Sequence, residues 1–232
     1  MLILVPSPLS QIGPCLPVLQ QDLPLVQSCR TWVVENAKPA RAALGLINMP
    51  VPIRELELHE MAQVQAPEMF ALLGRAAAGE PIALMSDAGC PGVADPGAQW
   101  VRKAHELGCP VHPLVGPSSL LLALMASGMN GQQFKFNGYP PVDAAARDAW
   151  IRNSEKESRQ QNCTQLAIET PFRNDRLLDA LCKVLHPSTL LCLAWDLTGP
   201  GQTIKSQTVA QWRKKPEAPG KQPCLFLWLA AD

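Results

Sequence analysis

The sequence has no excess of charge of either sign, because 20 Lys and Arg residues are balanced by 20 Asp and Glu residues. With a formal net charge of zero, the chain creates no overall positive field that would draw it to nucleic acid. Charged residues make up only 17% of the chain and hydrophobic residues 47%, which excludes general disorder. Its 232 residues are enough for one large or two small domains with a buried core.

The sequence also lacks the run of about 18 apolar residues that a membrane-spanning helix needs. It has no basic segment followed by an apolar one, which is the pattern of a secretory signal. No internal repeat is visible. From these absences we expect a soluble, cytoplasmic protein that makes no contact with a membrane.

The sequence also lacks the cysteine and histidine spacings that are typical of metal sites. The eight cysteines include no CxxC pair, and the four histidines show no HExxH spacing. Most of the cysteines lie in apolar segments, where a free thiol behaves as a small buried hydrophobe. We therefore expect no metal and no disulfide framework. The eight are Cys15, Cys29, Cys90, Cys109, Cys163, Cys182, Cys192 and Cys224.

The most informative segment that is present is IALMSDAGCPGVADPG, from Ile82 to Gly97. Its four apolar residues predict a buried strand, and the glycines and prolines that follow predict a loop at the end of that strand. Asp95 and Pro96 favour a new helix, with Asp95 as its N-cap and Pro96 as its first residue. A strand, a loop with a carboxylate and a helix together form a common ligand-binding arrangement in α/β sheets.

A second loop of this kind is Leu114-Val115-Gly116-Pro117-Ser118-Ser119. Gly116 allows close backbone approach, and Pro117 is placed to open a helix. The amides of Ser118 and Ser119 are expected in the first turn, where unpaired N–H groups suit a carboxylate or phosphate. The following residues are apolar on every face, so this helix should be buried.

Strand and helix patterns alternate along the chain, which predicts an α/β fold. A stretch with three prolines, residues 12–28, can form at best a broken helix. The predicted strands are Leu2–Val5, Thr31–Val34, Ile82–Met85, Val111–Leu114, Phe134–Asn137, Gln165–Glu169, Leu190–Trp195, Thr203–Val209 and Cys224–Leu229. The predicted helices are Pro39–Ile47, Glu68–Ala78, Ala98–Leu107, Ser118–Met129, Asp143–Gln160 and Arg173–Leu185.

Five motifs carry a resemblance to a known family. SDAGCPGVADPG, PLVGPSS and the opening LILVPSP are similar to the tetrapyrrole methylase superfamily of S-adenosylmethionine-dependent methyltransferases. FKFNGYPP and AIETPFRNDRLLDAL bring the chain nearest to the branch that methylates a ribose 2′-hydroxyl of small-subunit ribosomal RNA. The resemblance spans nearly the whole chain. It implies two α/β domains, 1–115 and 116–232, with the cofactor crevice between them, and homodimers, which the superfamily commonly forms.

The resemblance also implies which residues contact S-adenosylmethionine, the one cofactor expected. The first-domain wall and the two loops supply most of them, and the last two positions lie later in the chain, beyond both loops. These residues are Pro8, Asp87, Ala88, Gly89, Cys90, Pro91, Val93, Ser118, Ser119, Glu169 and Leu197. Asp87 could instead cap its own loop, and a catalytic thiolate at Cys90 is an alternative to simple loop lining.

The methyl acceptor stays open between three alternatives: RNA, a tetrapyrrole or other small molecule, and no acceptor in a protein that only binds the cofactor. The branch's R-E-L-T-K segment is here Trp195-Asp196-Leu197-Thr198-Gly199, without the Arg or the Lys. Glu35 and Asp95 are candidate bases by position only. The basic residues Arg213, Lys214 and Lys215 could touch phosphate, but they are more typical of an exposed turn.

Overall fold

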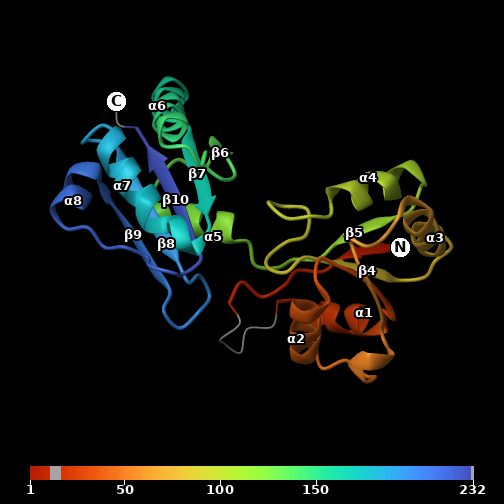
Figure 1. The fold of residues 1–232 in the computed structure, drawn as a ribbon. Helices are drawn as coiled ribbons and strands as arrows, with labels where there is room; N and C mark the ends of the chain where they lie inside the picture. Colours follow the sequence, from red (N-terminus) through yellow and green to blue (C-terminus); the bar gives the residue numbers. More distant parts are fainter. Residues whose placement is uncertain (11–16, 231–232) are drawn as a thin grey trace. The chain divides into compact units, whose positions relative to one another are not determined.

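The computed structural model describes residues 1–10 and 17–230, and the chain divides into two compact units. The first unit is Met1–Ser118 and the second is Ser119–Asp232. Each contains one five-stranded sheet covered by helices (Figure 1), so the predicted α/β class is confirmed. Among the described helices, none combines the length and the apolar character needed to cross a bilayer. Cys15 and part of the stretch 12–28 lie outside the described residues.

All strands of the first sheet are parallel, in the order β3-β2-β4-β1-β5. Parallel strands end at the same edge of a sheet, so the loops that follow them gather there. The central strands are continuous apolar runs because both their faces are covered. The strands are β1 (Leu2–Leu4), β2 (Thr31–Val34), β3 (Glu57–Glu60), β4 (Ile82–Met85) and β5 (Val111–Pro113).

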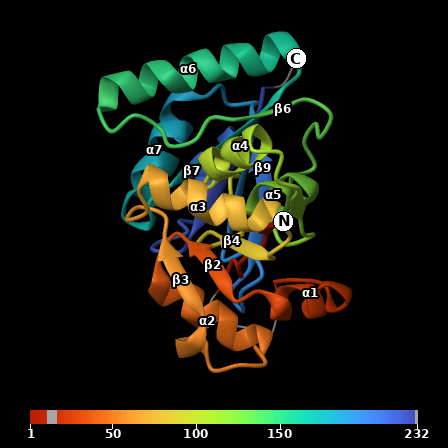
Figure 2. The ribbon, with the colours of Figure 1, turned by 90° about the vertical axis from the view of Figure 1, so that its right-hand side faces the viewer.

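Helices lie on both faces of this sheet (Figure 2). On β2, Trp32 and Val34 pack into one core cluster while Val33 packs into the other, as the period of two in a strand requires. The short η1 (Gln20–Asp22) and α1 (Leu23–Ser28) precede β2, and η2 (Ile53–Glu55) precedes β3. One face is covered by α1 and α2 (Ala37–Ile47), the other by α3 (Ala66–Ala77) and α4 (Ala98–Glu106).

The second sheet is mixed, in the order β6-β7-β10-β8-β9, with only β6 and β7 parallel. Its main core contains Trp212, Trp228 and Phe226, all fully buried. The strands are β6 (Phe134–Phe136), β7 (Thr164–Glu169), β8 (Leu190–Trp195), β9 (Thr203–Thr208) and β10 (Cys224–Leu229). The helices are α5 (Ser119–Ser127), α6 (Ala144–Gln161), η3 (Pro171–Arg173), α7 (Asn174–Val184) and α8 (Val209–Lys214).

Two predicted helix starts are wrong. The helix after the central loop begins at Ala98 with Gly97 as its N-cap, so Asp95 is not a cap and Pro96 is not helical. The helix after the second loop begins at Ser119, two residues beyond Pro117. In the first loop the Pro96 carbonyl accepts the Gly92 N–H at 3.1 Å, and in the second the Pro117 carbonyl accepts from the Cys90 thiol.

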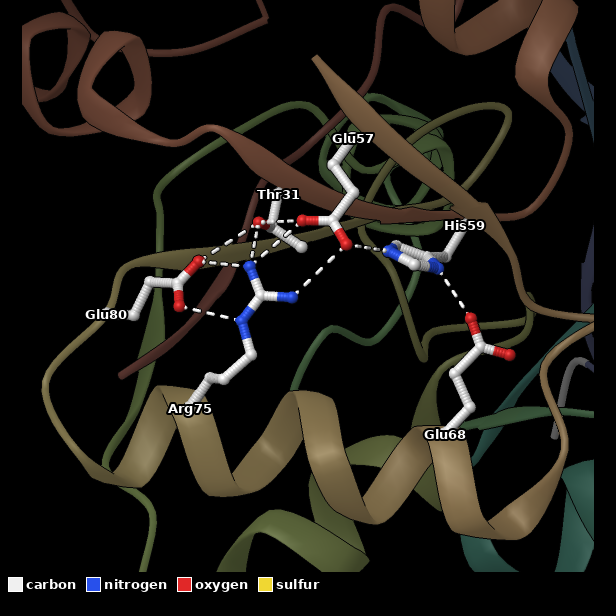
Figure 3. A network of polar contacts seen from close by, with 6 residues as sticks. All are labelled: Thr31, Glu57, His59, Glu68, Arg75 and Glu80. Carbon is white, nitrogen blue, oxygen red and sulfur yellow. Dashed lines mark hydrogen bonds and ion pairs between the residues drawn. The ribbon is translucent and has the colours of Figure 1, made fainter.

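A network of ion pairs ties α3 to the amino ends of the strands (Figure 3). Arg75 donates to Glu57 at 2.9 Å, to Glu80 at 2.7 Å and to the Thr31 hydroxyl at 2.8 Å. On the other side of Glu57, His59 bonds Glu57 at 3.0 Å and Glu68 of α3 at 2.7 Å. The hydrogen bond from Arg75 lowers the pKa of Glu57 to about 2.

Candidate functional site

Three loops leave the carboxyl ends of the adjacent strands β4, β1 and β5. The loops after β1 and β4 are joined by a two-residue bridge, in which the Ser7 N–H donates to the Gly89 carbonyl at 2.8 Å and the Gly89 N–H donates back at 3.1 Å. The buried Ser7 hydroxyl also donates to the Ser86 carbonyl at 2.5 Å. These bonds fix the loop from Ser86 to Gly89 against the first strand.

The loop after β5 is pressed against the other two. The Cys90 thiol lies 3.4 Å from the Pro117 carbonyl oxygen. A Cβ added to Gly116 would lie 2.1 Å from Cγ of Pro6 and 2.9 Å from the Pro17 carbonyl oxygen. Only glycine fits there, because no real Cβ approaches other atoms so closely. The two loops that the sequence singled out are therefore parts of one structure within the first unit.

Gly89 shows why the central loop needs glycine. Its φ is +67°, in the left-handed region where a side chain is strained. A Cβ there would also lie 3.3 Å from the Leu9 side chain and 3.7 Å from the Pro117 carbonyl oxygen. Glycine at this position therefore lets the neighbouring loops pack closely against the backbone of the central loop.

Carboxylates gather at the same edge of the sheet. Glu35, which follows β2, accepts the Asp87 N–H at 3.0 Å, and the Asn36 amide donates to the Asp87 carboxylate at 2.7 Å. Burial, followed by the charges of Glu35 and Asp87, raises the pKa of Asp95 from 3.8 to about 6. The edge therefore presents a local concentration of negative charge on a chain that is neutral overall.

A cavity of about 650 Å³ opens beside these carboxylates, and its lining lies wholly within the first unit. Glu35 and Asn36 line it, together with Pro96 and Gly97 of the central loop. The rest is built by the segment after β3 and by α3 and α4: Met61, Ala62, Val64, Gln65, Ala66, Met69, Phe70, Gln99, Trp100 and Lys103. We call it the Phe70 cavity.

Eight of the eleven predicted cofactor contacts lie in the first unit, and Ser119, Glu169 and Leu197 belong to the second. Asp87, Ala88, Gly89, Cys90 and Pro91 share the central loop, which is bonded to the loop after β1 that includes Pro8. Val93 is exposed just beyond. Ser118 and Ser119 follow Pro117, and Ser119 is the first residue of α5.

Glu169 and Leu197 belong to the second unit. The buried Glu169 carboxylate pairs with Arg173 at 2.7 Å and accepts the Thr170 N–H at 2.7 Å. Leu197 is 6% exposed, between Asp196 and Thr198, which both have positive φ. For these two residues, as for the predicted contacts in the first unit, contact with the cofactor stays a prediction.

The alternative roles weighed for the cysteines and for the basic tail find little support in the geometry. Burial raises the pKa of the Cys90 thiol, which disfavours the reactive thiolate. Within the described part of the chain, no group of side chains could hold a metal ion. Arg213 belongs to the last turn of α8 and donates to the carbonyls of Cys182 and Leu185, so the expected turn is wrong at this residue.

No family model matches the chain. A protein of Escherichia coli O157:H7 named ribosomal RNA small subunit methyltransferase I is 31% identical over 219 residues, which cover 93% of this chain and 73% of the relative. This chain belongs to the ribosomal RNA small subunit methyltransferase I family. A Vibrio cholerae protein of the same name is 29% identical over 231 residues, covering 100% of this chain and 72% of that relative. The predicted family is thereby confirmed, and with it the class of enzyme, a methyltransferase.

Solved structures of other methyltransferases share the fold of this family member. The methyltransferase CobJ has a TM-score of 0.58 at 19% identity, covering 93% of this chain and 89% of that one. The uroporphyrin-III-C-methyltransferase of Thermus thermophilus has a TM-score of 0.56 at 18% identity, covering 98% of this chain and 91% of that one. At such low identities these likenesses support the architecture alone.

Sequence reasoning missed the Phe70 cavity. One signal was available: α3 buries Met69, Leu72, Leu73 and Ala76, and Phe70 lies off that buried stripe. A large aromatic residue outside the buried face of an amphipathic helix indicates a binding surface or a partner contact.

Proposed function

We propose that this protein transfers a methyl group from S-adenosylmethionine to RNA, at a ribose 2′-hydroxyl of small-subunit ribosomal RNA. The observation that carries the proposal is the bonded set of loops after β1, β4 and β5, in a chain whose relatives are named ribosomal RNA small subunit methyltransferase I. When bound, the cofactor supplies a methyl group on a sulfonium, which is its own good leaving group. The protein's task is then placement of donor and acceptor in line.

The residues of the first unit fit such a cofactor. S-adenosylmethionine carries a positive sulfonium and a positive amino group, and the carboxylates of Glu35, Asp87 and Asp95 supply the opposite charge at this edge. The N–H groups of Ala88 and Ser118 donate no hydrogen bond within the described chain, so they are available to the cofactor's carboxylate. Asp87 is fixed by Glu35 and Asn36, which gives its carboxylate a defined position.

The direct test has two arms. In the first, S-adenosylhomocysteine is titrated into the purified protein by calorimetry; we expect heat of binding and a raised melting temperature. In the second, methyl-labelled S-adenosylmethionine and small ribosomal subunits from a strain lacking the gene are incubated with the protein. Mass mapping of the RNA should then show one new methylated ribose.

Each arm has an outcome that contradicts the proposal. No binding at millimolar S-adenosylhomocysteine would refute the proposal that the protein uses S-adenosylmethionine. Binding without methylation of RNA, but with methylation of a porphyrinogen, would move the function to the tetrapyrrole alternative. Binding without transfer to either acceptor would favour a protein that only binds the cofactor.

Two further parts of the proposal concern assembly and location. We propose a homodimer, because Leu121 and Met125 of α5 are 52% and 80% exposed and exposed apolar residues one helical turn apart favour a partner surface. Light scattering on the purified protein measures the mass directly, and a monomer at micromolar concentration would contradict it. A ribosomal substrate also implies that the protein works in the cytoplasm.

A further inference from the structure

The Phe70 cavity has an apolar floor with one open aromatic ring. Met69 and Trp100 form its buried part, at 8% and 3% exposure, while Phe70 is 44% exposed. They come from two neighbouring helices, α3 and α4, packed on the same face of the sheet. An apolar lining with an accessible aromatic ring suits a flat aromatic ligand.

The polar part of the lining is made of amides. Gln65, Gln99 and Asn36 each carry a side-chain group that can both donate and accept a hydrogen bond. The Gln99 amide makes no hydrogen bond to any other described residue, so it is available to a ligand. Paired donors and acceptors of this type read the edges of unpaired bases.

The lining contains one positively and one negatively charged side chain. Lys103 is its only cation and Glu35 its only carboxylate, so a ligand with many carboxylates, such as a porphyrinogen, finds no matching charge. The Lys103 ammonium lies 4.9 Å from the centroid of the Phe70 ring and also pairs with Glu106. An aromatic ring with a single cation beside it matches a ligand in which a flat ring is linked to one anionic group.

We infer that the Phe70 cavity takes one unpaired nucleotide of the RNA acceptor, with its base against Phe70 and its phosphate toward Lys103. The inference rests on the proposed function, because Glu35 and Asn36 line the cavity and also hold Asp87 of the cofactor loop. The volume of about 650 Å³ accommodates a nucleotide. A base within a duplex cannot enter such a cavity, so the acceptor is single-stranded or extruded.

Binding is tested without any methyl transfer. The probes are CMP, UMP, AMP and GMP at millimolar concentration, followed by saturation-transfer NMR on the base protons. We expect saturation of the base protons of at least one nucleotide by the unmodified protein. Phe70→Ala should weaken binding of that nucleotide about tenfold, which is the usual effect of removing a stacking ring.

Phe134→Ala is the matched control, because Phe134 of β6 is also 44% exposed and does not line the cavity. It should leave nucleotide binding unchanged. Lys103→Gln tests the anion separately: it should remove the preference for the monophosphate over the corresponding nucleoside, which a general loss of folding would not do. Melting temperatures of all three variants show whether each is folded.

The outcomes separate this inference from the proposed function. Absence of saturation with all four nucleotides, or equal binding by Phe70→Ala and the unmodified protein, would overturn the inference even if ribosomal RNA is methylated. Nucleotide binding lost in Phe70→Ala, in a protein that fails to bind S-adenosylhomocysteine, would instead support the cavity and refute the proposed function. In a methylation assay, Phe70→Ala should lower the rate or raise KM for subunits about tenfold and leave S-adenosylhomocysteine affinity unchanged.

Discussion

At the scale of single residues, Gly116 has the strictest steric requirement in the site. Its missing side chain is what lets the loop after β5 lie directly on Pro6, because an added Cβ would lie 2.1 Å from that ring. Gly89 has a different requirement, a positive φ of +67°. The two glycines of the predicted loops are thus needed for separate reasons, close packing and backbone conformation.

Replacing Gly116 by alanine should separate the loops. We expect Gly116→Ala to lower the free energy of unfolding by about 1–3 kcal/mol, the usual cost of forcing atoms into a packed site. Affinity for S-adenosylhomocysteine should fall with it. Gly131→Ala is the control, since nothing lies within 4 Å of a Cβ at that position. Chemical denaturation measures the first effect and calorimetry the second. If Gly116→Ala changes neither the free energy of unfolding nor the affinity, the loops are not held by this contact.

Asp87 is held by Asn36, and this contact allows its two possible roles to be told apart. If Asp87 contacts the cofactor, Asp87→Ala should weaken the binding free energy of S-adenosylhomocysteine by about 1–3 kcal/mol, as for one hydrogen bond to a charged group. Asn36→Ala removes the same 2.7 Å hydrogen bond from the other side and leaves the carboxylate in place, so its effect should be smaller. Equal losses in the two variants, measured by calorimetry, would indicate that Asp87 only shapes its loop.

If S-adenosylmethionine binds at this edge as proposed, Asp95 should make its affinity depend on pH. Its pKa is raised to about 6 by burial and by Glu35 and Asp87, so the carboxylate gains its charge as the pH rises through that value. S-adenosylmethionine has a positive sulfonium and S-adenosylhomocysteine a neutral thioether. We expect the ratio of their affinities to rise in favour of S-adenosylmethionine by about two- to tenfold between pH 5 and 7.5. Asp95→Asn should flatten this rise, and a constant ratio in the unmodified protein would refute it.

At the scale of elements, the Arg75 network fastens α3 to the sheet at the end opposite the site. Arg75→Met should lower the free energy of unfolding at pH 7 by about 1 kcal/mol, because the charges are more than a third exposed and solvent weakens them. The folded-state pKa of Glu57, about 2, lies below its ordinary value of 4.5. Its contribution is therefore complete above pH 4.5 and lost as the pH falls toward 2.

The same variant tests that pH dependence. Urea denaturation from pH 7 to pH 2 should show a shallower loss of stability between pH 4.5 and 2 in Arg75→Met than in the unmodified protein, since Glu57 then titrates nearer its ordinary value. Lys135→Met is a control for a surface ion pair that does not involve this network. Parallel curves for Arg75→Met and the unmodified protein would contradict the role given to the network.

The elements that the sequence predicts well are those whose own residues determine them. Strands β2, β4, β8 and β10 have the bounds that their largely apolar segments predict. Strand β3 was missed because its sequence, ELHE, is polar, and its place at the sheet edge depends on ion pairs with α3 that no local pattern reveals. Helix α8 was also missed, although Thr208 and Gln211 form a capping box that could have indicated its start.

The candidate site was only partly predictable for the same reason. The glycines and the carboxylate of the central loop are recognisable in sequence, because turn chemistry is local. The bridge between Ser7 and Gly89 and the hydrogen bond from the Asp87 N–H to Glu35 join residues far apart in the chain, so only the folded sheet brings them together. A local rule predicts Asp95 as a helix cap, but the loop continues to Gly97, which is the N-cap in the structure.

At the scale of the whole molecule, each unit has its own hydrophobic core. We expect Leu73→Ala, in the first unit, to speed hydrogen exchange of the amides in β1, β2 and β4, with a cost of about 2–5 kcal/mol. Leu181→Ala, in the second, should act on β7, β8 and β10 in the same way. Exchange measured peptide by peptide would contradict separate cores if either variant accelerated both sheets equally.

Glu35 has one carboxylate in two environments: it accepts the N–H of Asp87 and it forms part of the wall of the Phe70 cavity. If the proposed cofactor and the proposed nucleotide both depend on the position of this group, binding of one changes the affinity for the other. Thermodynamic linkage then requires reciprocity, so that whatever factor a nucleotide applies to the dissociation constant of S-adenosylhomocysteine, S-adenosylhomocysteine applies to that of the nucleotide. The protein would sense through this single side chain whether donor and acceptor are present together.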